Sequence, residues 1–148
     1  MSDTRTADAR VLRVVNFFEQ LSPTDLTRMG EYYAADASFK DPFSEVRGVP
    51  AITAVFEHMF RALHAPRFVV KDIIADGDQC FLSWDFRFRF QRFAPSVEQT
   101  VHGASQLRFA ADDRIVLHRD YWDAAEELYE KLPGVGALMR WLKRRASA

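Results

Sequence analysis

Residues 115–123 read Ile-Val-Leu-His-Arg-Asp-Tyr-Trp-Asp, and the rest of the predicted fold is arranged around them. Side chains along a β-strand alternate between two faces, so a strand here places His118, Asp120 and Trp122 in one row. Because Val116 shares that face, the row combines an imidazole, a carboxylate and an indole with an apolar neighbour. A carboxylate in such a setting must be paired or hydrated. We therefore predict that this row lines a ligand pocket.

The composition fits one domain with a cavity walled by aromatic rings. The chain has 148 residues, of which 48% are hydrophobic and 14% aromatic, with 13 Phe among them. That length is enough for one core, and the aromatic content exceeds what a small core needs. We expect a single domain over residues 1–148 that binds a small hydrophobic molecule.

Charge and cysteine content disfavour several classes of partner. The net charge of -1 gives no field that attracts nucleic acid. The basic cluster of Arg140, Lys143, Arg144 and Arg145 fits the last turns of a helix, where cations oppose the macrodipole. A lone Cys80 forms no internal disulfide and suits a reducing compartment. No apolar run has the length of a membrane span or a signal sequence. We therefore expect a cytoplasmic protein with no nucleic-acid or membrane partner.

Apolar periodicity predicts helices first and strands afterwards. His58 lies off the apolar stripe of the third helix, so we expect it at the surface. The fold class is α+β: three N-terminal helices pack on a curved antiparallel sheet, and residues 124–148 form a helical tail of the same domain. The predicted helices cover residues 7–21, 22–35 and 48–63, with a short extended piece at 37–41 that Pro42 closes. The predicted strands cover 68–75, 79–93, 97–109 and 115–123, and the tail helices cover 123–131 and 138–145.

Residues 34–43, Ala-Ala-Asp-Ala-Ser-Phe-Lys-Asp-Pro-Phe, follow a helix pair and precede the helix that Gly48 opens. This order, the D-x-x-F-x-D-P pattern and the closing meander resemble the superfamily of nuclear transport factor 2, ketosteroid isomerase and the SnoaL-like polyketide cyclases. The resemblance covers roughly residues 8–123. It implies a cone-shaped NTF2-like fold with a deep apolar pocket and, as in many members, a homodimer formed through the outer face of the sheet. The helical tail, residues 124–148, lies beyond the part of the chain that the resemblance covers, and we expect it to close the mouth of the pocket.

Ketosteroid isomerase uses an Asp base with an oxyanion hole made of a Tyr and a protonated Asp. Matched through the Asp-Pro, the resemblance places the base at Asp41, the tyrosine near Phe17 and the second acid near Ser105. Phe17 has no donor, and a Ser hydroxyl donates more weakly than a carboxylic acid. Loss of one oxyanion donor typically costs about 2.7–4 kcal/mol of transition-state stabilisation. We therefore expect chemistry other than authentic steroid isomerisation.

The same register brings Asp41 to the wall opposite His118 and Asp120. We predict that these three residues are catalytic. A carboxylate whose pKa is raised by an apolar cavity takes a proton from a carbon acid, and a second group returns it or protonates an oxygen. Such chemistry, without cofactor or metal, suits isomerisation, aldol-type cyclisation or dehydration of a mostly apolar, ring-sized substrate. The predicted ligand-lining residues are Phe17, Tyr32, Phe56, Phe60, Trp84, Ser105 and Trp122.

Several alternatives stay open at this point. Asp41 could serve only to hold a turn, and Asp120 could form an ion pair with His118 that has no chemical role. The pocket could hold a hydrophobic molecule without turning it over. The chain could also be a dimeric protein-interaction module, with the charged strand face of Arg87 and Arg89 as its surface.

Strand parity disfavours two further kinds of site. Limonene epoxide hydrolase, another relative, uses an Asp-Arg-Asp set, and the nearest candidate here, Asp85-x-Arg87, lies on the face opposite the apolar row. His102 likewise lies opposite Ser105. His102, His118 and Asp120 are therefore not expected to converge on a metal ion.

Overall fold

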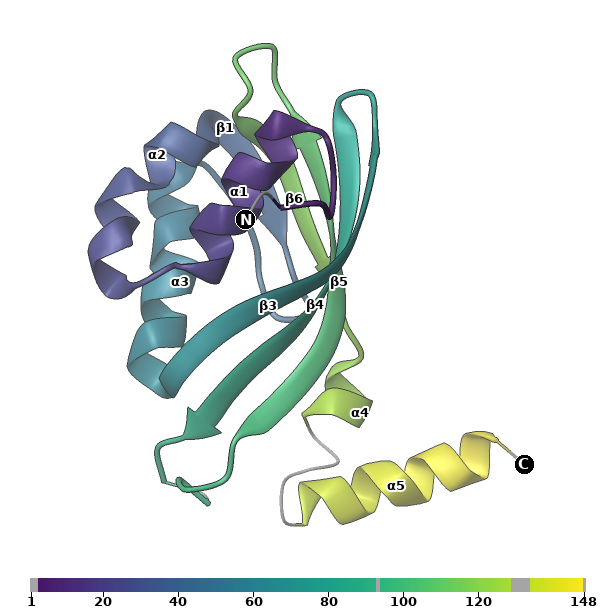
Figure 1. Ribbon diagram of the computed structural model, residues 1–148. Coiled ribbons are helices and arrows are strands. Elements are labelled where there is room, and N and C mark those ends of the chain that lie inside the picture. The colour runs from purple at the N-terminus through teal and green to yellow at the C-terminus, as the bar shows by residue number, and fades with distance from the viewer. Residues whose placement is uncertain (1–2, 93, 129–133, 148) are drawn as a thin grey trace.

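The computed structural model describes residues 3–92, 94–128 and 134–147 (Figure 1). Its N-terminal helices lie on one side of a curved six-stranded sheet, whose strand order is β2-β1-β6-β5-β4-β3 (Figure 1). The helices are α1 (Ala9–Glu19), the 3₁₀ helix η1 (Pro23–Arg28), α2 (Met29–Tyr32), α3 (Val49–Ala62), α4 (Ala124–Glu127) and α5 (Val135–Ala146). The strands are β1 (Tyr33–Lys40), β2 (Glu45–Arg47), β3 (Leu63–Asp76), β4 (Gln79–Phe90), β5 (Gln99–Phe109) and β6 (Ile115–Tyr121).

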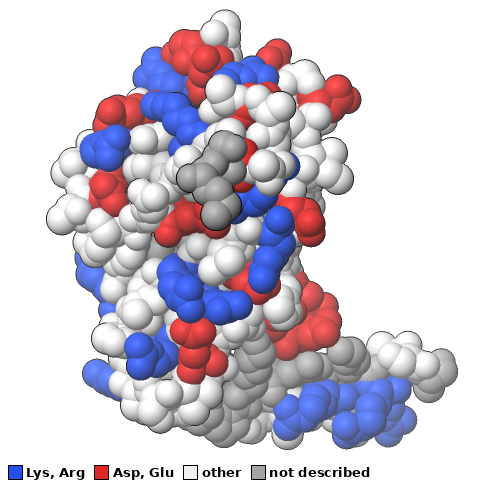
Figure 2. All heavy atoms as spheres, viewed as in Figure 1, with Lys and Arg blue, Asp and Glu red and all other residues white. Residues whose placement is uncertain are grey.

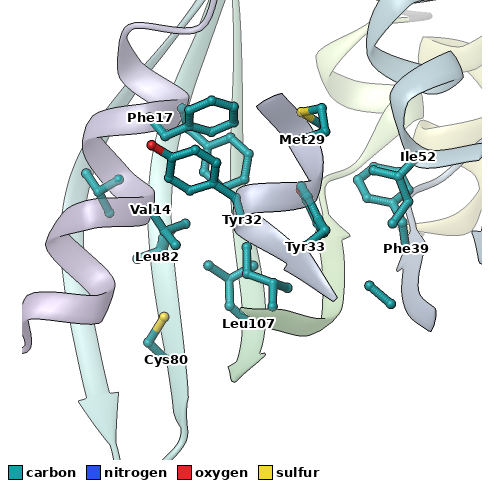
Figure 3. Packing of buried hydrophobic residues seen from close by; sticks show 14 of the residues in the cluster. Val14, Phe17, Met29, Tyr32, Tyr33, Phe39, Ile52, Cys80, Leu82 and Leu107 are labelled. Atoms are coloured by element: carbon teal, nitrogen blue, oxygen red, sulfur yellow. The ribbon is translucent and has the colours of Figure 1, made fainter. Parts of the chain in front are cut away.

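The core lies between the inner face of the sheet and the helices. The α1 helix starts after Asp8, whose carboxylate accepts hydrogen bonds from the backbone N–H groups of Arg10 and Val11. Its buried stripe faces the sheet (Figure 3). Cys80 is buried in this core as expected, and burial raises the pKa of its thiol to about 12. The largest fully buried side chains are Tyr33, Met29, Ile52, Leu107, Ile115, Val11, Val14 and Val15.

The sheet is mixed rather than antiparallel throughout. Strands β3 to β6 form the predicted antiparallel meander, but β1 adds to its edge parallel to β6. A tight turn then leads from β1 into the antiparallel β2, closed by a hydrogen bond from the Asp41 N–H to the Ser44 carbonyl. The α+β fold with helices on one face of a curved sheet is as predicted, and the added strand brings β1 beside β6.

The second helix ends earlier than predicted, at Tyr32 rather than Ala35. The chain becomes extended at Tyr33, and the inward positions of the strand are then Tyr33, Ala37 and Phe39, with a register shift between Tyr33 and Ser38. Helical periodicity cannot show this change, because Ala34 and Ala35 are strong helix formers and favour continuing the helix. The early end is what turns Tyr33 toward β6.

Two bulges bend β3 around the helices. The pairing of β3 with β4 shifts register between His64 and Arg67 and again between Val70 and Asp72. Bulges increase local twist and bend a strand. At the first bulge Ala65 has a φ of 50°, a left-handed conformation that a β-strand does not otherwise adopt. The bends curve the sheet so that its inner face wraps the helices (Figure 1).

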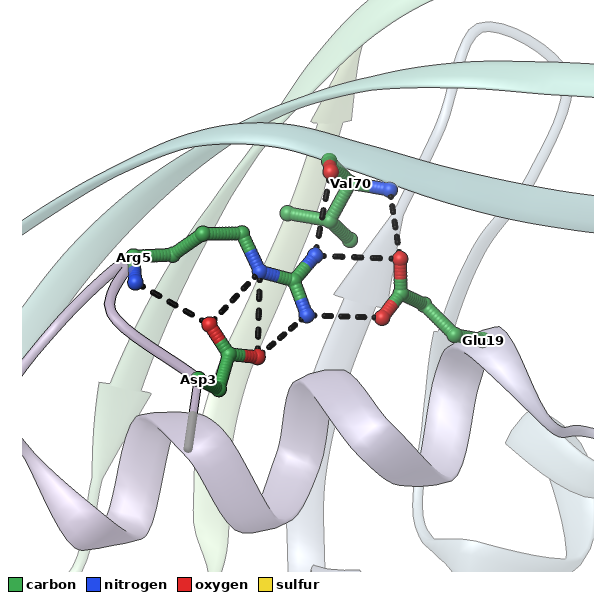
Figure 4. Close-up of polar contacts among 4 residues, drawn as sticks. All are labelled: Asp3, Arg5, Glu19 and Val70. Carbon is green, nitrogen blue, oxygen red and sulfur yellow. Dashed lines mark hydrogen bonds and ion pairs between the residues drawn. The ribbon is translucent and has the colours of Figure 1, made fainter. Parts of the chain in front are cut away.

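The second bulge is held from the helix side by two charged residues (Figure 4). The Glu19 carboxylate accepts a hydrogen bond from the Val70 N–H at 3.0 Å, and the Arg5 guanidinium donates to the Val70 carbonyl at 3.0 Å. Arg5 also pairs with Glu19, at 2.8 Å, and with Asp3. The hydrogen bonds from Arg5 lower the pKa of Asp3 to about 2. Backbone groups that the bulge removes from the ladder are thus satisfied by side chains.

The C-terminal helices lie on the other side of the sheet from α1–α3 (Figure 1). Lys and Arg side chains gather over α5 (Figure 2), and its Leu138, Trp141 and Leu142 are exposed. Within the described part of the chain, no helix is both long and apolar enough to cross a membrane.

The clamp on the second bulge gives a test of fold stability. Replacing Glu19 with Ala leaves the Val70 N–H without its partner, so Glu19→Ala should lower the free energy of unfolding by about 1–3 kcal/mol. Glu31→Ala is the matched control, because Glu31 pairs with Arg28 on the exposed surface; that change should cost at most about 1 kcal/mol. Urea denaturation of both variants measures the difference. Equal losses would contradict the role given to Glu19.

Candidate functional site

A cavity of about 480 Å³ lies between α3 and the inner face of the sheet. Its volume is within the range of small-molecule sites, and it suits a ring-sized ligand. Nine of its 19 described lining residues are Phe or Trp, and the carboxyl groups of Asp41 and Asp120 lie among them. The described lining residues are Phe39, Asp41, Phe43, Ser44, Val55, Phe56, His58, Met59, Ala62, Leu63, Phe68, Trp84, Phe86, Phe88, Phe90, Val101, Asp120, Trp122 and Leu128.

Asp120 is fixed by hydrogen bonds from two neighbouring strands. The Nε2 atom of His118, two residues earlier on β6, lies 2.7 Å from Oδ1 of Asp120. The Ser105 hydroxyl, opposite Asp120 in the β5–β6 register, donates to the same oxygen at 2.5 Å. In turn, the Trp84 indole on β4 donates to Ser105 Oγ at 2.8 Å. Among the described residues, no hydrogen-bond partner reaches the second oxygen, Oδ2.

His118 is held on its other side by Tyr33, and both side chains are buried. The Tyr33 hydroxyl lies 2.6 Å from Nδ1 of His118, with the two rings parallel within 1°. Burial, together with the nearby Asp120 charge, raises the pKa of Tyr33 well above its ordinary value. The hydroxyl therefore keeps its proton, which it can donate to Nδ1. With that proton donated to Nδ1, the proton of the imidazole lies on Nε2 and is donated to Asp120.

Asp41 reaches the cavity from the turn between β1 and β2. Its Oδ1 atom accepts hydrogen bonds from the backbone N–H groups of Phe43 at 2.8 Å and Ser44 at 2.7 Å. The carboxyl group therefore holds the turn, which is the structural role considered for Asp41 from the sequence. The same carboxyl also lines the cavity. Desolvation raises the pKa of Asp41 and the Asp120 charge adds to the rise, while the two backbone hydrogen bonds oppose it. Asp41 therefore stays protonated to a higher pH than an ordinary aspartate.

The structure brings together most of the residues predicted to form the site. Asp41, Asp120, Phe56, Trp84 and Trp122 line the main cavity. His118 and Ser105 line a small recess of about 30 Å³, which shares Phe56, Trp84 and Asp120 with the main cavity. His118 and Ser105 therefore lie behind Asp120 and act on it, rather than facing the main cavity.

Three predicted lining residues lie elsewhere. Phe17 and Tyr32 stack on each other with ring centroids 3.7 Å apart, within the core beside α1 and away from the cavity (Figure 3). Phe60 on α3 is also absent from the cavity wall. The lining arc of that helix includes Val55 and Met59, and a step of about 100° per residue carries Phe60 beyond it.

Other residues of the site escaped the sequence analysis. The sequence pattern predicted Tyr32, and not Tyr33, as a lining residue. The apolar periodicity does not show that the helix ends at Tyr32 and the strand begins at Tyr33. His58, expected at the surface, is exposed but lies at the edge of the lining arc and forms part of the cavity wall. The alternation of Phe86, Phe88 and Phe90 with charged residues did indicate an apolar inner face, which these rings form.

The opposite face of the sheet holds a separate polar cluster. His102 Nδ1 lies 2.7 Å from Asp85, and Lys71 and Arg87 also approach that carboxylate. The hydrogen bond from His102 lowers the pKa of Asp85. Asp85 and Arg87 thus lie away from the cavity, as strand parity predicted for the Asp-x-Arg pair. In the described ranges, no group of three or more His, Cys, Asp or Glu side chains is arranged to hold a metal ion.

Residues 14–118, more than half of the chain, match the family model of the SnoaL-like domain. The chain belongs to the SnoaL-like family. The match includes β1, α3 and the strands β3–β5, and it ends at His118. No curated protein sequence matches this SnoaL-like chain.

Solved structures share the fold of the SnoaL-like chain. A protein of ketosteroid isomerase-like fold from Catenulispora acidiphila DSM 44928, in complex with trimethylamine, has a TM-score of 0.70 and 17% identity over 83% of this chain and 92% of its own. A protein from Shewanella putrefaciens CN-32 that is named a SnoaL-like polyketide cyclase has a TM-score of 0.68 and 16% identity, over 83% and 98% of the two chains. An LEH-like epoxide hydrolase from M. tuberculosis has a TM-score of 0.64 and 19% identity, over 87% and 91%. At these identities, the likeness establishes the NTF2-like fold alone.

Packing beside the site gives a second test. The Trp84 indole lies flat over Gly103, and a Cβ at residue 103 would come within 2.7 Å of the indole Cζ2. Gly103→Ala should displace the indole from Ser105 and lower the free energy of unfolding by about 1–3 kcal/mol. Thermal unfolding measures the loss, and the Trp84 indole N–H resonance in NMR reports the broken hydrogen bond.

Gly30→Ala is the control for that change. A Cβ at residue 30 meets nothing closer than Val49 Cγ1 at 4.0 Å, and Ala in the α2 helix is favoured over Gly by about 0.5–1 kcal/mol. Gly30→Ala should therefore leave stability equal or higher. If Gly103→Ala were as stable as Gly30→Ala, the close packing of Trp84 on β5 would not matter for the fold.

Proposed function

We propose that this SnoaL-like protein is a cofactor-independent acid–base enzyme acting on a mostly apolar, ring-containing small molecule. Asp120 is the base that takes a proton from carbon, and Asp41 is the acid that protonates an oxygen. This division suits an isomerisation, an aldol-type cyclisation or a dehydration. The observation that carries the proposal is the Asp120 carboxylate in an aromatic cavity, with one oxygen held by His118 and Ser105 and the other without a partner among the described residues.

The geometry gives the two carboxyl groups different tasks. We take Tyr33 to donate to Nδ1 of His118, so that Asp120 receives hydrogen bonds from an uncharged His118 and from Ser105. These donors hold its orientation without neutralising its charge. Asp41 keeps its proton to higher pH because it is desolvated beside Asp120. Two carboxyl groups whose environments separate their protonation are the usual basis for assigning a base and an acid. Phe86, Phe88 and Phe90 leave the rest of the cavity for an apolar body.

The fold of the relatives is consistent with a small-molecule site. One structural relative holds trimethylamine, and another is named a SnoaL-like polyketide cyclase. The steroid isomerase pattern receives no support from the positions matched to it. Phe17 is packed against Tyr32, and Ser105 donates to Asp120 instead of to a substrate.

The test is deuterium exchange into a panel of cyclic ketones and enones, followed by ¹H NMR in D₂O. Asp120→Asn should lower the exchange rate by at least about 100-fold, the contribution typical of a positioned base. The amide Oδ1 can still accept from His118 and Ser105, so the melting temperature should change little. Asp41→Asn likewise keeps an acceptor for the turn and should slow exchange.

Asp36→Asn is the control, because Asp36 is exposed on β1 and away from the cavity. It should match the unsubstituted protein in rate and melting temperature. Ketones that bind without exchange would favour a non-catalytic binding protein. A large fall in melting temperature for both Asp41→Asn and Asp120→Asn, with no exchange in the unsubstituted protein, would show that the carboxylates serve only the fold.

A further inference from the structure

The cavity has an unbalanced charge. Its described lining residues include two carboxyl groups and one imidazole, that of His58, but no Lys or Arg. Within the described ranges, neither Asp41 nor Asp120 forms an ion pair with Lys or Arg. The imidazole that contacts Asp120 is that of His118, which the proposed function takes as uncharged. Carboxylates taken out of water without a compensating cation are costly. A ligand that brings a positive charge would repay part of that cost.

Two aromatic rings line the cavity close to the carboxyl groups. Phe43 lies two residues after Asp41, and Trp122 directly follows the end of β6, two residues after Asp120. Their rings meet edge to face, with centroids 5.4 Å apart, at the cavity wall. The faces of aromatic rings, Trp above all, attract ammonium groups. Carboxyl groups and ring faces therefore share one end of the cavity.

The other end of the cavity differs in chemistry. Phe86 and Phe88 have centroids 5.2 Å apart, and Phe88 and Phe90 follow at 5.1 Å along β4. These rings line the wall as a continuous apolar row, with Met59 and Ala62 of α3 also lining the cavity. Such a wall excludes charge and binds hydrocarbon. The cavity thus has one acidic, aromatic end and one apolar end.

We propose that the cavity selects a hydrophobic organic cation, an amine or quaternary ammonium compound with a ring-sized apolar body. The nitrogen lies beside Asp41 and Asp120 and next to the Trp122 ring, and the body packs on Phe86, Phe88 and Phe90. This inference rests on the proposed function in taking the same cavity as the ligand site, and it names the ligand class. In a substrate of this class the nearby positive charge lowers the pKa of Asp41, so Asp41 releases its proton on binding and acts as the counter-ion instead of as the acid. The positive nitrogen then stabilises the charge that develops when Asp120 removes a proton, and Asp120 returns that proton.

Three probes of one shape and different charge test the proposal: phenyltrimethylammonium, its neutral isostere tert-butylbenzene, and the anion benzenesulfonate. Chemical-shift titration of the full chain gives each dissociation constant. The ammonium compound should bind at least about tenfold more tightly than tert-butylbenzene, because ring faces and carboxylates attract it. Benzenesulfonate should not bind. Equal affinity for the ammonium and neutral probes, or binding of the sulfonate, would overturn the proposal.

Substitutions at the acidic end of the cavity test which residues cause the preference for the ammonium probe. Asp120→Asn and Trp122→Leu should each weaken phenyltrimethylammonium binding by about tenfold, whereas Asp120→Asn should leave tert-butylbenzene binding unchanged and so show that the cavity is intact. Asp36→Asn is again the control and should bind as the unsubstituted protein does. Ammonium binding that survives Asp120→Asn and Asp41→Asn combined would place the cation elsewhere and contradict the proposal.

The binding experiment and the ketone exchange assay can fail independently of each other. Selective ammonium binding with no deuterium exchange in any ketone would sustain the ligand class and reject the acid–base reaction. Exchange in neutral ketones, with no preference for the ammonium probe, would sustain the reaction and reject the ligand class.

Discussion

The hydrogen-bond chain from Tyr33 through His118 to Asp120 is the interaction on which the site depends. It joins the N-terminal strand β1 to β6, and the Ser105 and Trp84 side chains extend it across β5 and β4. In the proposed arrangement every donor in the chain points toward Asp120, so its Oδ1 is saturated while its charge stays uncompensated. Buried polar networks of this kind hold one arrangement when every member is satisfied. The four strands are therefore tied together at the atom from which the proposed chemistry starts.

The fold supplies this chain and the cavity by the same means. The parallel pairing of β1 with β6 places Tyr33 beside the buried His118, and the turn that follows β1 sends Asp41 back over the cavity. Bulges in β3 curve the sheet around the helices, and the Arg5–Glu19 clamp satisfies the backbone at one of them. Gly103 allows Trp84 to lie flat across β5, where it reaches Ser105. The curvature of the sheet creates the cavity, and the hydrogen-bond chain fixes Asp120 at the cavity wall.

Patterns local to one strand predicted much of this arrangement. Alternation along β6 placed His118, Asp120 and Trp122 on one face, and alternation along β4 separated the Phe row from Asp85 and Arg87. The resemblance through Asp41 and Pro42 anticipated a carboxyl group on the facing wall. Contacts between segments that are far apart in the sequence could not be predicted from these local patterns. Nothing in the sequence showed that a helix would end at Tyr32, that β1 would lie parallel to β6, or that Tyr33 would meet a histidine 85 positions later.

The central claim is that Asp120 is a carboxylate held by a neutral His118, and ¹⁵N NMR of the histidine side chains tests it most directly. The account predicts that, near neutral pH, Nε2 of His118 carries a proton and Nδ1 does not, because Nδ1 accepts from Tyr33. In Tyr33→Phe this preference should weaken. A doubly protonated His118 in the unsubstituted protein would contradict the account, because Asp120 would then be neutralised by an ion pair. A proton on Nδ1 alone would also contradict it, since Asp120 would lose the donor that holds it.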